Sequence, residues 1–356
     1  MPHEKLRLLH VVHRYGPVGG MERYVWELTL ELQQLGHQVT VICERCHAKK
    51  SWGIQVYELG DIAARPHWLS QLRFSGRVKA WLKANPHPGW VIHSHERLGV
   101  HHLTTFHGSP FATIFERSFW RWISLRVWMR LYLEQRELAV ASVIVPNSQF
   151  VKQQLAHYYP QQQHKLTGPV MPGVMPGTLR GFHLVPQQGG IIGFVGKEWR
   201  RKGLPLALKI VAQLRRKRPE LELWVIGPDA HEVQHLFAGW QGGYRLLGWR
   251  SDTEFYAELD VLLHPAKAEP YGMVISEAMA ACVPVVVSNL CGAATEVAAE
   301  SGDVLSLEAP LDDWVNAVDQ QLLRKDAPPA YQRSWCDVAL DYEKIYMPMA
   351  NSDALS

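Results

Sequence analysis

The sequence lacks an apolar run long enough to cross a membrane, and its start lacks the apolar segment of an export signal. A membrane-spanning helix needs about 18 or more consecutive apolar residues, and no stretch of the chain reaches that length. The first ten residues, MPHEKLRLLH, mix charged and apolar side chains and do not resemble a signal peptide. These two absences favour a cytoplasmic protein.

Cysteine and net charge are also scarce. Five cysteines among 356 residues do not make a disulfide framework, and free thiols fit a reducing compartment. Cys43 and Cys46 form a C-x-x-C pair, but a zinc site needs a second pair of ligands, and none stands at a suitable spacing. The formal net charge of +3 is too small to indicate a nucleic-acid-binding protein.

What the chain does contain is a regular alternation of strand-like and helix-like segments. Apolar segments such as LRLLHVV, QVTVIC and WVIHS recur between longer stretches with helical periodicity, and the pattern restarts at GIIGFVG. A Pro-, Gly- and Gln-rich stretch over 160–190 separates the two halves. The alternation predicts parallel sheets covered by helices. We therefore expect an α/β fold with two doubly wound domains in tandem.

Ligands of such sheets bind beyond the carboxyl ends of the strands, so two loops that follow strands are of interest. RYGPVGG ends in Gly19 and Gly20 before a helix, where the backbone can approach a phosphate; a plain turn explains it equally well, and no G-x-G-x-x-G is present. GFVGKEWRRKG holds four cations. They form either a solvated basic loop or a clamp for a diphosphate.

A third segment, EPYGMVISEAMAACVPVV, places two carboxylates around a short apolar stretch. Ser276 is predicted to cap the helix EAMAA, with Glu277 in its first turn. In that interpretation the carboxylates serve only the helix. The alternative is that Glu269 and Glu277 accept hydrogen bonds from sugar hydroxyls, while the backbone amides from Tyr271 to Val274 face a phosphate.

Several motifs now stand in one order along the chain. Glu269 and Glu277, with seven residues between them, resemble the E-x7-E signature of retaining glycosyltransferases of the GT-B fold, family four in the usual classification. VGKEWRRKG resembles that family's V-G-R-x-x-x-x-K-G loop, and GPVGGMERYVWELTLELQQLGHQVTVI resembles its N-terminal helix and next strand. VIHSHE, TTFHG, IVPNS and YQRSWCDVALDYEKIY resemble further elements. The likeness covers essentially the whole chain.

The resemblance implies two Rossmann-like domains that face each other across a cleft. Residues 1–175, completed by a closing helix over 335–350, form the acceptor domain, and 185–334 bind the donor. The donor is a nucleotide-sugar such as a UDP- or GDP-sugar, transferred with retention of configuration. No cofactor or metal is expected, because lysines neutralise the phosphates and D-x-D is absent. His93, His95, His101 and His102 offer a metal alternative, but no carboxylate pair accompanies them.

The resemblance also assigns roles to individual residues. Lys197 and Lys202 neutralise the departing diphosphate, Glu277 binds the ribose, and Glu269 holds the transferred sugar. The catalytic residues are then His107, Lys202 and Glu269, with His107 near the anomeric centre. The donor-binding residues are Gly19, Gly20, Lys197, Lys202, Glu269, Tyr271, Gly272, Met273, Val274 and Glu277. Lys197 and Cys282 depart from the pattern, since the family usually has Arg and Gly there.

The acceptor is less defined. The segment 115–137 mixes arginines with tryptophans, which favours either a helix on an anionic membrane surface or a half-buried helix with snorkelling arginines. The first interpretation fits a cytoplasmic enzyme peripheral to the inner membrane that extends a lipid-linked, lipopolysaccharide or cell-surface glycan. A soluble small acceptor is the alternative. A nucleotide-sugar epimerase of the same fold and a silent sugar-binding scaffold remain as further alternatives.

Overall fold

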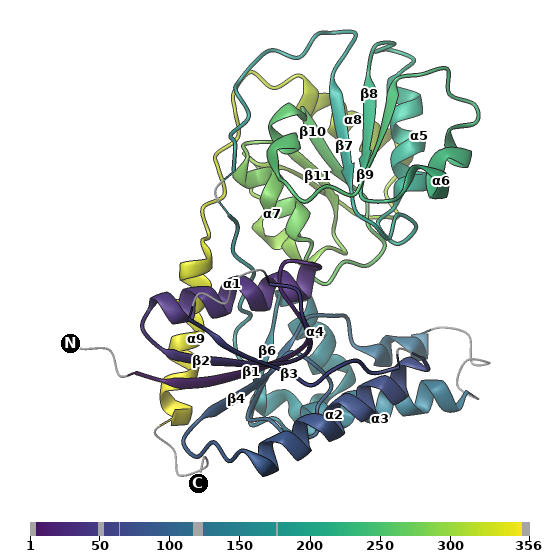
Figure 1. The fold of residues 1–356 in the computed structure, drawn as a ribbon. Coiled ribbons are helices and arrows are strands. Elements are labelled where there is room, and N and C mark those ends of the chain that lie inside the picture. The colour runs from purple at the N-terminus through teal and green to yellow at the C-terminus, as the bar shows by residue number, and fades with distance from the viewer. Residues whose placement is uncertain (1–4, 49–52, 64, 117–123, 176, 351–356) are drawn as a thin grey trace. The chain divides into compact units, whose positions relative to one another are not determined.

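The computed structural model describes residues 5–48, 53–63, 65–116, 124–175 and 177–350 (Figure 1). The chain divides into two compact domains. The N-terminal domain comprises 1–173 together with 333–356, and the C-terminal domain comprises 174–332. The boundary after residue 173 falls within the Pro- and Gly-rich stretch of the sequence.

The N-terminal domain is built on a six-stranded sheet in the order β3-β2-β1-β4-β5-β6. Every pairing in it is parallel. The order reverses between β1 and β4, and such a switch point is where doubly wound sheets bind ligands. The strands are β1 (Arg7–Tyr15), β2 (Gln38–Cys46), β3 (Gln55–Glu58), β4 (Val91–Ser94), β5 (Leu103–Phe106) and β6 (Val143–Pro146).

Helices cover both faces of this sheet. Leu9 and Val11 of β1 pack on Phe74 of α2, whereas the next residue, His10, points to the opposite face and meets Tyr346 of α9. The closing helix α9 therefore completes the N-terminal domain. The helices are α1 (Gly20–Gln34), α2 (His67–Ala84), α3 (Leu125–Val140), α4 (Gln149–Tyr158) and α9 (Trp335–Ala350), with 3-10 helices η1 (Phe111–Glu116) and η3 (Pro160–Lys165).

The C-terminal domain repeats this topology, with a parallel sheet in the order β12-β11-β10-β7-β8-β9 and a switch point between β7 and β10. Its strands are β7 (Ile191–Val195), β8 (Glu222–Ile226), β9 (Tyr244–Gly248), β10 (Val261–His264), β11 (Val285–Ser288) and β12 (Gly302–Leu305). Its helices are α5 (Leu204–Leu214), α6 (Ala230–Val233), α7 (Met273–Ala280) and α8 (Leu311–Leu322), with η4 (Gln234–Phe237), η5 (Glu254–Glu258) and η6 (Gly292–Glu296).

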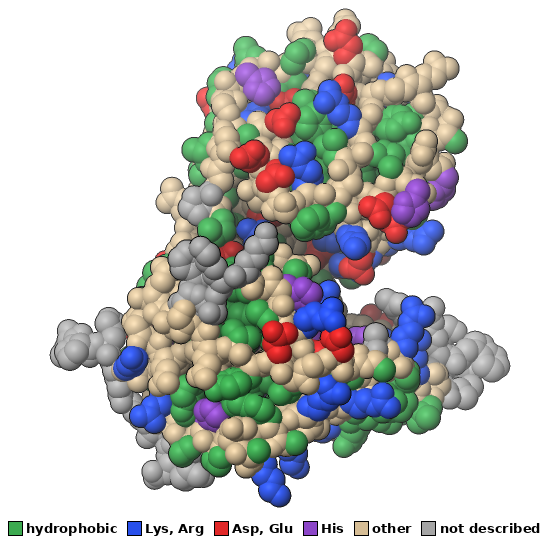
Figure 2. All heavy atoms as spheres, in the orientation of Figure 1, with side chains coloured by type: hydrophobic (Ala, Val, Ile, Leu, Met, Phe, Trp, Pro, Cys, Tyr) green, Lys and Arg blue, Asp and Glu red, His purple; other side chains and the backbone are tan. Residues whose placement is uncertain are grey.

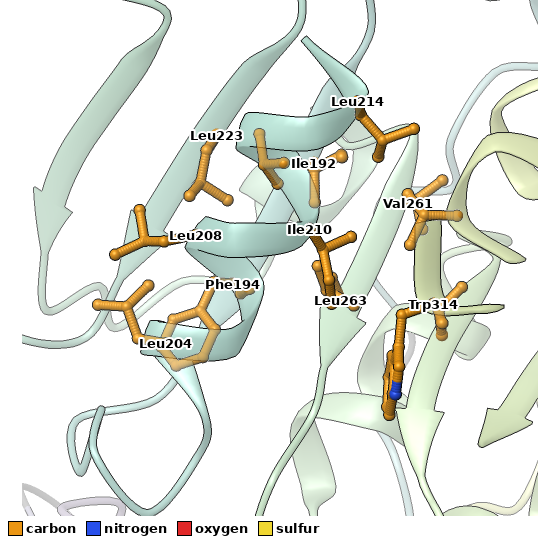
Figure 3. Packing of buried hydrophobic residues seen from close by; sticks show 14 of the residues in the cluster. Ile192, Phe194, Leu204, Leu208, Ile210, Leu214, Leu223, Val261, Leu263 and Trp314 are labelled. Atoms are coloured by element: carbon orange, nitrogen blue, oxygen red, sulfur yellow. The ribbon is translucent and has the colours of Figure 1, made fainter. Parts of the chain in front are cut away.

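The largest hydrophobic cluster among the described residues lies between the C-terminal sheet and helices α5 and α8. Figure 3 shows Leu204, Leu208 and Ile210 of α5 directed at Phe194 of β7 and neighbouring strands. Trp314 of α8 is fully buried in the same cluster. Full burial of a Leu, Ile or Phe side chain contributes about 1.5–3 kcal/mol to the stability of the fold. This packing therefore fixes the strand ends that carry the site.

The predicted α/β class with two doubly wound parallel sheets is confirmed. The segment 115–137 is not one helix, however: η1 ends at Glu116 and α3 starts at Leu125, while 117–123 lie outside the described residues. None of the helices in the described ranges is long and apolar enough to cross a membrane. On the face drawn in Figure 2, acidic and basic side chains are interspersed on both domains, in keeping with the small net charge.

Candidate active site

The loop after β7 carries the predicted basic cluster at the switch point of the C-terminal sheet. Lys197 is exposed there, whereas Arg201 and Lys202 are partly buried. The loop ends at Gly203, whose φ is 86° and whose Cβ would lie 1.9 Å from the carbonyl oxygen of Pro265. Only glycine fits this turn, and the close approach holds the loop against the segment that follows β10.

Glu269 lies in that segment and is only 7% exposed. Its Oε2 is 3.0 Å from Lys202 Nζ, 3.3 Å from Arg201 Nη1 and 3.7 Å from His264 Nε2; the last separation is too long for a hydrogen bond. Burial alone would raise the pKa of Glu269, but His264, Lys202 and Arg201 outweigh burial and hold that pKa well below its ordinary value. Glu269 is therefore ionised at neutral pH, with Lys202 as its nearest ionic partner.

Helix α7 begins four residues before its predicted start. Gly272, with a φ of 98°, precedes it, and Met273 is its first residue. Ser276 lies inside the helix, where its hydroxyl is 2.8 Å from the Tyr271 hydroxyl, so its predicted role as N-cap is wrong. The amides of Met273 and Val274 belong to the first turn, whose N–H groups have no intrahelical acceptor. This turn favours an anion.

Glu277 lies in the second turn of α7, not in the first as predicted, because the helix starts earlier. Its Oε2 accepts a hydrogen bond of 2.9 Å from the Tyr256 hydroxyl, and its side chain is partly exposed. Glu269 and Glu277 thus bracket the first turn of α7 along the chain. One carboxylate is held by cations and the other by a phenol.

Gly19 and Gly20 lie where β1 gives way to α1 in the N-terminal domain. Gly19 is extended, with a φ of −166°, and a Cβ on it would lie 2.3 Å from Glu22 Oε2. A Cβ on Gly20 would point into open space. Glu22 is 7% exposed and pairs with Arg14. The predicted glycine turn is therefore present, with a buried carboxylate against it.

His107 follows β5 at the carboxyl edge of the N-terminal sheet and lines a pocket of about 150 Å³. Within this pocket Glu137 accepts a hydrogen bond of 2.7 Å from Thr104, and burial raises the pKa of Glu137 to about 8. Arg97 is 2.6 Å from Glu134. The polar lining is completed by Gln71, His95, Glu96, Thr105 and Ser109.

Three histidines lie close together beside this pocket. Ring nitrogens of His10, His93 and His95 lie within 4.8 Å of one another. Nδ1 of His93 is 2.6 Å from the Tyr346 hydroxyl, and its Nε2 is 2.7 Å from the Thr105 hydroxyl. Because both nitrogens of His93 are engaged, a metal ion could bind all three rings only by breaking one of these bonds.

The structure thus brings Lys202, Glu269 and the start of α7 together in one domain. It also adds two residues that sequence reasoning missed. His264 ends β10 five residues before Glu269. Its position at the carboxyl end of a strand, where ligands of such sheets bind, was the signal that could have identified it. Tyr256 comes from η5, and no local pattern pointed to it. Arg200, by contrast, lies over the Trp199 ring, 4.4 Å from its centroid.

Two stretches of the chain match known protein families. Residues 18–167 match "Glycosyltransferase Family 4", and residues 189–324 match "Glycosyl transferases group 1". The chain belongs to the group 1, family 4 glycosyltransferases. The resemblance drawn from the E-x7-E motif is therefore confirmed, and with it the class of enzyme, the glycosyltransferases of EC 2.4.

Among curated relatives, this glycosyltransferase is 26% identical over 262 residues to the D-inositol 3-phosphate glycosyltransferase of Corynebacterium aurimucosum. That match covers 64% of the chain and 60% of the relative. It is 27% identical over 163 residues to the lipopolysaccharide glucosyltransferase WaaG of Escherichia coli, covering 44% and 43% of the two proteins. The chain thus spans about half the length of these two relatives.

Solved structures align over nearly the whole chain. Sucrose-phosphate synthase from Thermosynechococcus elongatus has a TM-score of 0.78 at 18% identity and covers 97% of this chain and 99% of its own. WaaG has a TM-score of 0.74 at 17% identity, with 98% and 96% covered. HepE from Anabaena, in complex with UDP and glucose, has a TM-score of 0.69 at 15% identity, with 96% and 99% covered. These likenesses show that this glycosyltransferase has the GT-B fold.

Proposed function

We propose that this protein transfers a sugar, with retention of configuration, from a nucleotide-sugar to a hydroxyl of a glycan or glycolipid. The observation that carries the proposal is the buried, ionised Glu269. It is paired with Lys202 and lies just before the first turn of α7, at the switch point of the C-terminal sheet. This position combines a carboxylate that can accept hydrogen bonds from sugar hydroxyls with an ammonium group and a helix start that can bind a phosphate.

The C-terminal domain would bind the donor. The ammonium of Lys202 and the first turn of α7 favour the diphosphate. Glu269 and Glu277 accept hydrogen bonds from hydroxyls of the sugar and the ribose, respectively. A UDP- or GDP-sugar fits this set of groups, and the UDP and glucose in HepE support a nucleotide-sugar donor.

During transfer, negative charge grows on the departing diphosphate. Lys202 would swing from Glu269 to this charge, and the first turn of α7 would stabilise it, so the site is complementary to the transition state. Glu269 keeps the sugar oriented, while the departing phosphate takes the proton of the attacking hydroxyl on the same face. The protein supplies position and charge, and no residue serves as a covalent nucleophile. With lysine neutralising the phosphates, transfer proceeds without a metal ion.

The N-terminal domain would bind the acceptor in the pocket lined by His107. Gln71, Ser109 and Glu137 offer hydrogen bonds suited to a hydroxyl-rich ring. The lipopolysaccharide glucosyltransferase among the relatives supports a lipid-linked or cell-surface glycan as the acceptor. A peripheral position at the inner membrane would bring the enzyme to such an acceptor. A soluble polyol is the second candidate, since the inositol phosphate enzymes are relatives too.

The test is incubation with UDP-, GDP-, ADP- and dTDP-sugars, with and without lipid-linked and soluble acceptors, in excess EDTA. We expect the release of a nucleoside diphosphate from donors of one base only. The product should have, by NMR, the same anomeric configuration as the donor. Epimerised donor without transfer would show an epimerase, and binding without turnover would show a scaffold. An inverted product would contradict retention, and activity restored only by Mg²⁺ or Mn²⁺ would contradict metal independence.

A further inference from the structure

A chain of three histidines runs from the pocket into the N-terminal domain. Nε2 of His107 is 2.9 Å from Nδ1 of His95, and Nε2 of His95 is 3.1 Å from Nδ1 of His10. The chain stops there, because Nε2 of His10 is buried and has no hydrogen-bond partner among the described residues. His93 cannot supply one, since both of its ring nitrogens are bonded elsewhere.

All three rings in this chain are neutral. Burial lowers the pKa of His10 and of His107 to about 3 and holds the pKa of His95 well below its ordinary value. A neutral imidazole has one N–H and one bare nitrogen. The two hydrogen bonds can therefore point in only two directions, either all from His107 towards His10 or all from His10 towards His107.

The end of the chain decides between these directions. If the bonds pointed inward, His10 would carry its proton on Nε2, and a buried N–H would have no acceptor. If they point outward, His10 carries its proton on Nδ1, and the unpartnered atom is a bare nitrogen. Orphaned buried N–H groups are rarer than under-satisfied acceptors, so the outward direction is the stable one. His107 then receives a hydrogen bond at Nε2 and must carry its own proton on Nδ1.

We propose that His10 and His95 are positioning residues that hold His107 as the Nδ1–H tautomer, so that His107 offers the pocket a hydrogen-bond donor and not a base. Nε2 of His107 is committed to His95, and no hydrogen bond to its Nδ1 is found in the described part of the chain. Only this N–H is left for a ligand. The role of that donor rests on the proposed function: it would bind a hydroxyl oxygen of the sugar or the acceptor. The tautomer itself does not depend on it.

The first test needs no substrate. In ¹⁵N-histidine-labelled protein, one-bond ¹⁵N–¹H correlations should place the proton on Nδ1 in His107, His95 and His10 alike, with single substitutions giving the assignments. His102 is an internal reference with the opposite tautomer, because its Nδ1 accepts a hydrogen bond of 3.0 Å from the Ile92 amide. A proton on Nε2 of His107 would overturn the proposal.

The second test links the tautomer to catalysis. His95→Leu removes the N–H that fixes His107; we expect a mixed tautomer at His107 and a fall in kcat of about tenfold, the scale of one hydrogen bond. His95→Asn keeps a hydrogen-bond donor at this position and should restore both the single tautomer of His107 and the kcat. His101→Leu is the matched control: His101 is also buried but bonds the Glu137 carbonyl, and the tautomer of His107 should not change.

The outcomes separate the two proposals. If a folded His95→Leu protein kept both the His107 tautomer and kcat unchanged, the proposed role of the histidine chain would be overturned. An equal tautomer shift in His101→Leu would overturn it too. If His107 has the Nδ1–H tautomer while the wild-type protein transfers no sugar to any acceptor, the role of the histidine chain stands and the proposed function fails.

Discussion

Cys282 shows at the scale of one residue how a departure from the family pattern is accommodated. It has a φ of 60°, a left-handed conformation that suits glycine, and it ends α7 in a Schellman motif. Its N–H bonds the Met279 carbonyl at 3.1 Å, and the Val283 N–H bonds the Ala278 carbonyl at 2.9 Å. Glycine, usual in the family, would fit without strain.

We therefore expect Cys282→Gly to stabilise the C-terminal domain by about 1 kcal/mol, which corresponds to a rise in Tm of roughly 2–4 °C for a domain of this size. Differential scanning calorimetry measures it. Cys291→Gly is the control in the same domain, since Cys291 has a φ of −101°, so that glycine relieves no left-handed strain there. A lower Tm for Cys282→Gly would show that its thiol contacts outweigh the backbone strain.

Glu269 is the residue on which the proposed chemistry depends most. Glu269→Gln keeps the volume of the side chain but removes the charge that balances Lys202 and that, in the proposed function, accepts hydrogen bonds from the sugar. We expect kcat/KM to fall roughly 100-fold, because hydrogen bonds to a charged group contribute about 1.5–3 kcal/mol. Glu198→Gln is the matched control: Glu198 also pairs with Arg201, but its side chain is 67% exposed. Near-normal turnover of the Glu269 variant would remove this residue from the site.

The two lysines of the β7 loop should not be equivalent. Lys202 pairs with Glu269 and has a side chain only 13% exposed, whereas Lys197 is exposed. Lys202→Ala should remove roughly 2–4 kcal/mol of transition-state stabilisation and lower kcat, while Lys197→Ala should have a smaller effect. Steady-state kinetics with one donor compares them. A Lys202→Ala enzyme that changes only KM would make Lys202 a ground-state binding residue.

At the scale of elements, sequence patterns predicted the segments of the candidate site but not how they meet. Strand ends and the E-x7-E spacing were readable, because apolar runs and glycines mark them locally. The start of α7 was misplaced because Ser276 looks like an N-cap, whereas the left-handed Gly272 begins the helix. The Lys202–Glu269 pair joins different loops, and the histidine chain depends on the register of three strands. Such tertiary pairings leave no local pattern.

Helix α3 is the element for which membrane contact can be tested. Its second half is packed, with Leu133 and Leu138 buried, but its first half exposes Leu125, Trp128 and Tyr132 by 70%, 54% and 54%. These three positions share one face of a helix, next to the exposed Arg126. Arg117 and Arg121 lie outside the described residues. Apolar and aromatic side chains beside cations suit an anionic bilayer surface.

We expect replacement of Leu125, Trp128 and Tyr132 by Ser to weaken co-sedimentation with anionic vesicles at least tenfold, a loss of about 1.4 kcal/mol. Wild-type binding should fall with added salt and be weaker on neutral vesicles. Trp249→Ser is the matched control, since Trp249 is 62% exposed but lies in the C-terminal domain. Equal binding of the triple variant and the wild type would support the packed-helix interpretation.

At the scale of the whole molecule, the two domains should respond differently to acid. The described part of the N-terminal domain contains four buried histidines and the half-buried His107 with lowered pKa values; the buried ones are His10, His93, His95 and His101. Unfolding returns them to about 6.5, so below that pH the unfolded state binds more protons than the native state. Stability then falls with acidification, by up to about 1.4 kcal/mol per pH unit for each histidine. Glu137, whose native pKa is about 8, opposes this trend, as do Glu27, Glu31 and Glu96, whose pKa values are raised by burial.

In the C-terminal domain the sign is the same, but fewer groups contribute: burial lowers the pKa of one described histidine there, His264. The pKa of Glu269 is depressed in the native state, so its stabilisation is present above the unfolded value of about 4.5 and is lost only below it. We expect hydrogen exchange mass spectrometry at pH 5.5 to show lower protection of the N-terminal sheet than at pH 7.5, after correction for intrinsic exchange, while the C-terminal sheet changes little. His95→Asn should reduce the difference in the N-terminal domain, because one titrating group is gone. Equal loss in both domains would mean that the buried histidines do not govern acid stability.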